Sequence, residues 1–173
     1  MNIEEILKRI KRTGGNINEP IEDYMFSCLS LSKEEYDEID NSIGIEVFCK
    51  QHDISFITIK YNKTINFIHY SDVDNEEDIK RLGLINVDSD WVPDLGLGIY
   101  VIEEKDIDAL DNLMDYFGEK DDEEELLKVT GTYTGPYEEC IYGEGHEGYI
   151  LIPHDVKPDN IDTEIICFEE IFY

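Results

Sequence analysis

Thiol, imidazole and carboxylate side chains gather in the last third of this sequence, at Cys140, His146, His154 and Asp155. Cysteine and histidine are frequent metal ligands, but spacings of six and eight residues along Cys140, His146 and His154 fit no standard zinc pattern. His146 would be the base for a Cys140 nucleophile, yet the two glutamates before Cys140 would raise the thiol pKa. We therefore predict no metal site, and the thiol nucleophile is an alternative.

The glycine-rich loop over residues 143–148 places two carboxylates, Glu144 and Glu147, close to a following apolar segment. A carboxylate in such a position can stabilise positive charge that develops on a sugar ring as a leaving group departs, as glycosidases do. The alternative is that the segment is only a solvated hairpin loop. Both interpretations stay open at this point.

Three segments occur in an order that is typical of one enzyme superfamily: residues 67–75, 95–102 and 148–161. The first contains His69-Tyr-Ser71 and leads into a short helix closed by Gly-Leu, and the second contains Gly-x-Gly98 followed by Tyr100. Together they resemble the ADP-ribosyltransferase superfamily, in particular its branches of DNA-modifying toxins and RNA 2'-phosphotransferase-like proteins. The resemblance covers about residues 64–165.

The resemblance implies that NAD is bound as a substrate. In related proteins the histidine and the neighbouring backbone hold the ribose and the amide of NAD, which places His69 and Ser71 at the cofactor. The residues Gly98 and Tyr100 would belong to the same site, with the Tyr100 ring stacked on nicotinamide.

The catalytic glutamate is where this sequence departs from the family. In some branches that residue would fall at Tyr149, which cannot stabilise positive charge. Glu147 and Glu144 are the nearby substitutes, so the resemblance gives the catalytic set as His69, Tyr100 and one of these two glutamates. The acceptor would be a protein or a small molecule.

Helices and strands are predicted from the spacing of apolar residues. Helices are expected over residues 2–12, from Ser32 with a Ser32–Glu35 capping box, from an Asp74 cap to Gly83, and over residues 104–117. Strands are expected over two parts of residues 54–70 joined by a turn at Asn62-Lys63, and over residues 97–102, 126–134, 137–142, 148–152 and 164–172.

This order of elements indicates an α+β fold. The resemblance implies a split sheet of mixed and antiparallel strands, as in ADP-ribosyltransferases. We expect residues 1–60 to form a mostly helical extension with one strand, and residues 61–173 to form the transferase-like domain.

Net charge is the outlier in the composition, because 42 acidic residues stand against 14 basic ones and give a charge of −28. Such a surface repels nucleic-acid phosphates and anionic lipids and attracts basic proteins. We therefore predict no nucleic-acid partner, no membrane partner and a basic protein partner. The densest acids are expected at residues 121–125 and along the helix over residues 104–117.

The four cysteines are widely separated, and the chain has no apolar run long enough to span a membrane. The first residues are charged, unlike those of a signal peptide, so a cytoplasmic location is expected. Two functions remain: an NAD-dependent ADP-ribosyltransferase, or a non-enzymatic acidic inhibitor such as an immunity protein or a nucleic-acid mimic. The second function includes a transferase fold that has lost catalysis.

Overall fold

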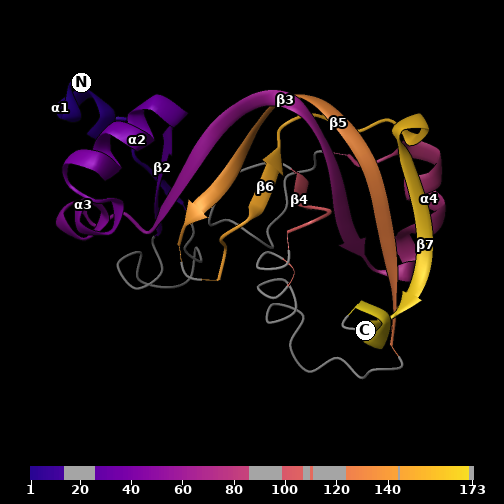
Figure 1. Cartoon of the computed structure of the whole chain (residues 1–173). Helices are drawn as coiled ribbons and strands as arrows, with labels where there is room; N and C mark the ends of the chain where they lie inside the picture. Colours follow the sequence, from indigo (N-terminus) through magenta and orange to yellow (C-terminus); the bar gives the residue numbers. More distant parts are fainter. Residues whose placement is uncertain (14–25, 86–98, 107–109, 111–123, 144, 172–173) are drawn as a thin grey trace, which may run out of the picture.

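The computed structural model describes residues 1–13, 26–85, 99–106, 110, 124–143 and 145–171. Within these residues the chain forms one mixed sheet of seven strands, in the order β1-β2-β3-β4-β6-β5-β7, together with four α-helices (Figure 1). A mixed sheet with helices agrees with the α+β class. No helix of the described residues is both long enough and apolar enough to cross a membrane.

Helices and strands at the start of the chain build an N-terminal unit, defined as residues 1–13 and 26–53. Its elements are α1 (Ile3–Leu7), β1 (Lys11–Thr13), β2 (Phe26–Leu31), α2 (Lys33–Ser42) and α3 (Ile45–His52). Phe48 and Ile39 are fully buried in a cluster that the helices share with β2. Because β2 pairs in parallel with β3, this unit is continuous with the rest of the sheet.

The start of α2 confirms the capping box predicted from the sequence. The Ser32 hydroxyl accepts a hydrogen bond from the Glu35 backbone N–H at 3.1 Å, and the Glu35 carboxylate accepts one from the Ser32 N–H at 3.0 Å. These two bonds satisfy backbone donors that the first helical turn leaves free.

The helix expected over residues 2–12 is wrong in length, because α1 ends at Leu7. Lys11, Arg12 and Thr13 instead pair with β2 in antiparallel register. Ile10 still packs on the N-terminal core, as the helical spacing indicated. The apolar pattern therefore identified the buried face, but strand pairing outside the local sequence ended the helix.

Two long strands, β3 (Phe56–Ser71) and β5 (Glu125–Tyr142), pair antiparallel over almost their whole length and bend together as an arch (Figure 1). The sequence predicted two strands in place of each one, and both of these predictions are wrong. Asn62 and Lys63 lie within β3, opposite Pro136 and Gly135 of β5. The turn-forming residues of both strands thus meet where the pair is exposed, and the chain does not reverse there.

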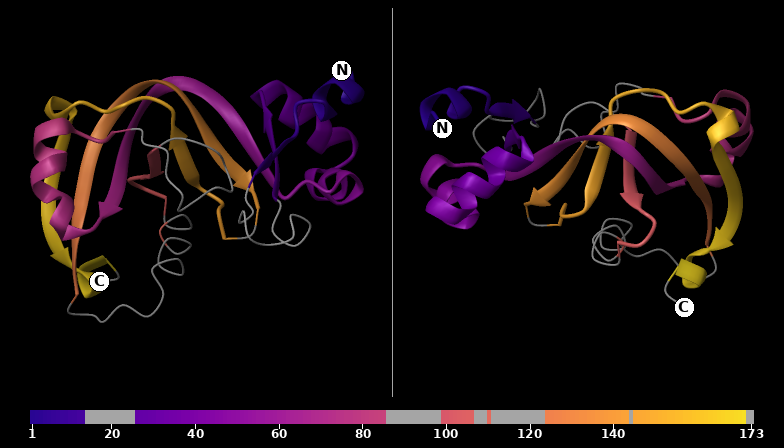
Figure 2. Two further views of the ribbon diagram at one scale, coloured as in Figure 1. Left: turned by 180° about the vertical axis from the view of Figure 1, so that it is seen from behind. Right: turned by 45° about the horizontal axis from the view of Figure 1, so that its top comes forward.

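Two short strands, β4 (Ile99–Glu103) and β6 (Tyr149–Ile152), connect the two sides of the arch (Figure 2). β4 pairs with β3 and with β6, while β6 also pairs with β5, so these four strands close into a ring of neighbours. Phe67, Val101, Val129 and Ile150 bring all four strands into one buried cluster. The strand predicted over residues 148–152 is confirmed.

After β3 the chain forms a 3₁₀ turn, η2 (Val73–Asn75), and then α4 (Glu76–Leu82). Asp72 caps η2 by accepting from the Asp74 N–H at 2.9 Å, whereas the N-cap of α4 is Asn75, so the predicted Asp74 cap is wrong. Gly83 ends α4 as predicted. It has φ of +80° and lies so close to the chain that a Cβ atom would come 2.0 Å from the Val156 carbonyl oxygen.

The last strand, β7 (Ile161–Cys167), follows the 3₁₀ turn η3 (Pro158–Asn160) and pairs with β5. It starts and ends earlier than the predicted strand over residues 164–172, because a further 3₁₀ turn, η4 (Phe168–Ile171), follows it. The predicted boundary at residue 60 falls inside β3. The helix expected over residues 104–117 lies largely outside the described residues.

Candidate functional site

His69 lies near the end of β3, where β3 and β4 separate after only two paired positions. Its Nδ1 atom is 2.7 Å from the Tyr100 carbonyl oxygen. A carbonyl can only accept, so this contact assigns the proton to Nδ1 of the neutral ring. Burial lowers the His69 pKa, and the hydrogen bond to the Tyr100 carbonyl partly opposes that shift.

The Tyr100 side chain does not share this position. His69 is paired with Val129 of β5, so its side chain lies on the same face of the sheet as those of Phe67 and Val129. The Val101 side chain belongs to the buried cluster on that face. Tyr100 packs instead with Ile68 in a different cluster. The two side chains therefore lie on opposite faces of the sheet, and the expectation of one cleft holding both is wrong. The hydrogen bond of His69 goes to the backbone carbonyl of Tyr100.

The other two residues expected at NAD give no further support to a cofactor site. Ser71 ends β3, and its hydroxyl accepts a hydrogen bond from the Asn75 side-chain amide at 2.9 Å. This bond ties the end of the strand to the following turn. Gly98 lies outside the described residues.

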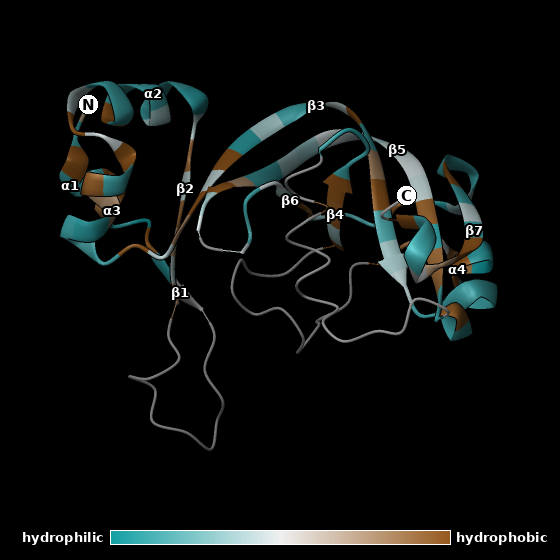
Figure 3. Cartoon of the chain, turned by 60° about the horizontal axis from the view of Figure 1, so that its bottom comes forward, coloured by the Kyte–Doolittle hydropathy of each residue, from teal (hydrophilic) through white to brown (hydrophobic). Residues whose placement is uncertain are grey.

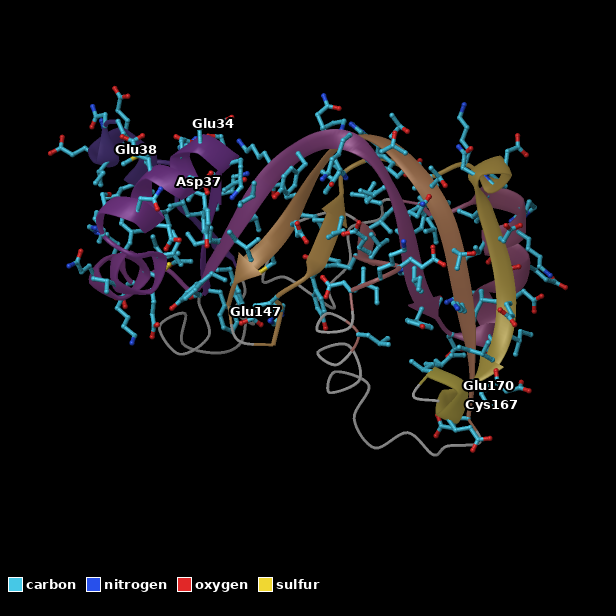
Figure 4. The ribbon with its side chains drawn as sticks, in the orientation of Figure 1. Glu34, Asp37, Glu38, Glu147, Cys167 and Glu170 are labelled. Carbon is cyan, nitrogen blue, oxygen red and sulfur yellow. The ribbon has the colours of Figure 1, made fainter. Side chains whose placement is uncertain are left out.

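Glu147 precedes β6 and lies at the far end of the β4–β6 pair from Tyr100. In this antiparallel register Leu151 is opposite Tyr100, while Tyr149 is opposite Ile102. Figure 4 shows Glu147 near the end of β5, and its charge raises the Cys140 pKa, so the two groups are neighbours. Glu144, the second predicted carboxylate, lies outside the described residues. Glu147 is therefore remote from His69.

The buried thiols of Cys28, Cys49 and Cys140 are not activated as nucleophiles. Burial is the main cause that raises the Cys140 pKa, and the Glu147 and Glu139 carboxylates act in the same direction. The pKa of Cys28 is raised to about 11 and that of Cys49 to about 12, again mainly by burial. A thiol that stays protonated is a poor nucleophile.

His146 packs its ring against aromatic rings. The ring centroids of Phe56 and Tyr149 lie 4.8 Å and 5.4 Å from that of His146. In the part of the chain that the structure describes, no group of three or more His, Cys, Asp or Glu residues is arranged to hold a metal ion.

Four of the nine carboxylates on the N-terminal unit, those of Glu35, Asp37, Glu38 and Glu46, form ion pairs. The unit contains nine acidic residues and six Lys or Arg residues. Arg9 pairs with Glu35 at 2.7 Å, Lys33 with Asp37 at 2.7 Å and Lys50 with Glu46 at 2.8 Å, each measured from N to O.

A pocket of about 360 Å³ opens between α1 and α2. Glu5, Glu34, Glu35 and Glu38 line it, and Arg9 lies among them and neutralises part of their charge. The charge run along α2 is visible in the sequence, but the pocket depends on how α1 packs beside it. The sequence alone did not predict it.

The opposite end of the molecule is different. We call residues 72–82 and 158–170 the acidic end; they include η2, α4, η3, β7 and most of η4, which lie together in Figures 1 and 2. These residues hold ten acids and only two basic residues, Lys80 and Arg81. Both are already used, in ion pairs with Glu76 and Asp78.

Eight acids of this end form no ion pair among the described residues: Asp72, Asp74, Glu77, Asp159, Asp162, Glu164, Glu169 and Glu170. All eight are exposed. Figure 3 shows hydrophilic residues along α4, and Figure 4 places Glu170 at the other end of the molecule from Glu34 and Glu38. The acids predicted to be densest, at residues 121–125, fall mostly outside the described residues.

Comparison with protein-family models, with curated proteins and with solved structures finds no match to this chain.

Proposed function

We propose that this chain is a non-enzymatic acidic protein that binds a basic protein partner, as an immunity protein or a nucleic-acid mimic does. The observation that carries this proposal is the acidic end, where ten carboxylates face only two cations. Exposed carboxylates without cations nearby make a negative potential that draws a positively charged partner and repels nucleic acid.

The uneven placement of the acids supports a role for the charge beyond solubility. In the N-terminal unit, ion pairs and the capping box involve several of the carboxylates. At the acidic end the carboxylates without ion pairs are exposed, and they lie together at one end of the molecule. An uneven distribution of this kind orients an approaching partner, whereas an even one would only keep the chain in solution.

The arrangement of the motif residues favours binding over catalysis. A transferase needs its histidine, its tyrosine ring and its glutamate around one substrate. Here the His69 and Tyr100 side chains are on opposite faces, and Glu147 lies beyond the other end of β4.

We propose that the fold is a transferase-like sheet whose catalytic activity has been lost and which retains a binding function. It is supported by β3, β4 and β6, the three strands that carry or follow the motifs, being neighbours in the sheet. The NAD-dependent activity itself stays a prediction. Calorimetric titration of the full chain with NAD tests it, and saturable binding would favour the transferase.

Affinity purification with the full chain as bait tests the binding function, followed by association kinetics of the captured protein. We expect a basic protein whose association rate constant falls about tenfold or more between low salt and about 0.5 M salt, because salt screens the steering field. A captured partner that is not basic, or whose association rate is indifferent to salt, would contradict the proposal.

A further inference from the structure

β7 is an edge strand of the sheet. It pairs with β5 over residues 161–167, and no other strand of the described residues pairs with it. In an edge strand every second residue points its N–H and C=O groups away from the sheet. Such a row of donors and acceptors is a template on which another extended segment can add as a strand.

The exposed side chains of β7 differ between the two faces. Asp162 and Glu164 lie on one face, which also carries the buried Ile166, and Ile165 lies on the other. All three are exposed, with Ile165 at 45%. Glu164 is directly opposite Lys128 of β5 in the register, and yet these two form no ion pair. The carboxylates of β7 are therefore open to cations from outside the chain.

The carboxylates of Asp162 and Glu164 also disfavour some partners at the edge of β7. A second copy of this chain would bring its own Asp162 and Glu164 against the same pair, and like charges across a strand pair are destabilising. Charged residues on an edge strand are a known protection against such self-association. The same carboxylates favour a strand that carries lysine or arginine.

We propose that the free edge of β7 binds an extended basic segment of the partner protein, which adds to the sheet as an eighth strand. Lysine or arginine would alternate along that segment, on the face of Asp162 and Glu164, with apolar side chains on the face of Ile165. The inference rests on the proposed function, and it names the place and the mode of binding.

The first test uses a ten-residue peptide that alternates Lys and Val, with two N-methylated versions. One version is methylated at every Lys amide and the other at every Val amide, so all three peptides have the same charge. Because the amides of alternate residues point to opposite edges, strand addition requires that one version bind about tenfold or more weakly while the other is tolerated. Equal affinity of all three peptides would overturn the proposal.

The second test compares two charge reversals in the full chain. Asp162→Lys with Glu164→Lys alters β7, and Glu34→Lys with Glu38→Lys makes the same change in net charge beside the α1–α2 pocket. We expect the β7 variant to lose about tenfold or more in affinity for the peptide, and the control to lose about twofold through the long-range field alone. The neutral pair Asp162→Asn with Glu164→Gln repeats the test if the reversed variant fails to fold, as circular dichroism would show.

The outcomes separate this inference from the proposed function. If the Glu34→Lys, Glu38→Lys control loses as much affinity for the peptide as the β7 variant, or more, the partner binds elsewhere or diffusely. The β7 proposal is then wrong, while the acidic binding function stands. If the unmethylated peptide does not bind at low salt and affinity purification returns no basic protein, both fall. Protection of β7 amides from hydrogen exchange on peptide binding, with α2 amides unchanged, supports the inference.

Discussion

The N-terminal unit and the acidic end carry almost the same number of acids, nine and ten, but use them differently. In the N-terminal unit Glu35, Asp37, Glu38 and Glu46 pair with nearby cations, and Glu35 also caps α2. At the acidic end the two basic residues are both paired within α4, and the acids of β7 and η4 are left without ion pairs among the described residues.

This difference separates acids that serve the fold from acids that oppose it. A carboxylate that accepts hydrogen bonds stabilises the native state, whereas a group of unpaired like charges destabilises the compact state through repulsion. Acids that persist despite that cost are better explained by a partner than by folding. The predictions below test the comparison, beginning with the largest expected effect.

The position of α4 in the acidic end depends on the close approach of Gly83 to the Val156 carbonyl. Gly83→Ala is therefore expected to disrupt that packing. The new Cβ would meet the carbonyl oxygen at 2.0 Å, with φ at +80°, and something must move. We expect a loss of about 3 kcal/mol or more in the free energy of unfolding, measured by urea denaturation.

Gly145→Ala is the matched control for this loss. Gly145 has nearly the same φ, +81°, but no heavy atom lies within 4 Å of the added Cβ. It should cost about 1 kcal/mol from backbone conformation alone. Equal losses in the two variants would show that the contact with Val156 does not hold α4 in place.

Local signals predicted well the parts of both regions that depend on neighbouring residues. Ser32 and Glu35 are three residues apart, and Gly83 ends its helix by its own conformational freedom, so the sequence identified both. The pattern failed where pairing is long-range. Asn62-Lys63 has the composition of a turn, and only the presence of Pro136 and Gly135 across the ladder shows that β3 continues through it.

The candidate site illustrates the same limit. The order of motifs placed His69 beside Tyr100, and the 2.7 Å hydrogen bond shows that the two residues do meet. Successive side chains of a strand point to opposite faces of the sheet. The face on which the side chains of His69 and Tyr100 lie therefore depends on the register between β3, β4 and β5. The sequence alone therefore could not show that the Tyr100 ring lies on the other face.

His69 lies where β3 leads into the acidic end, and its titration should make the stability of the chain depend on pH. Its folded-state pKa lies below the unfolded value, so the unfolded chain binds the extra proton first as pH falls. The stability is full above about pH 6.5 and falls as pH drops below that value, with a slope of at most about 1.4 kcal/mol per pH unit from this group.

His69→Asn is the matched variant for this slope, because its side-chain amide can donate to the Tyr100 carbonyl and does not titrate. The difference in unfolding free energy between wild type and variant, measured by urea denaturation from pH 7 to pH 5, should shrink or change sign toward pH 5. A difference that is constant over this range would mean that His69 accepts its proton as easily in the folded chain as in the unfolded one.

The smallest expected effect has opposite signs in the two regions. Glu35→Gln weakens the carboxylate that accepts from the Ser32 N–H and pairs with Arg9, so it should cost about 1 kcal/mol. Glu164→Gln removes an exposed acid that forms no ion pair among the described residues, and should leave stability unchanged within about 0.5 kcal/mol or raise it slightly. Urea denaturation of both variants in low salt measures the contrast, and about 0.5 M salt should reduce any gain from Glu164→Gln because screening already weakens the repulsion.

If Glu164→Gln destabilised the chain as much as Glu35→Gln, the acids of β7 would be stabilising the fold. The comparison between the two ends would then fail.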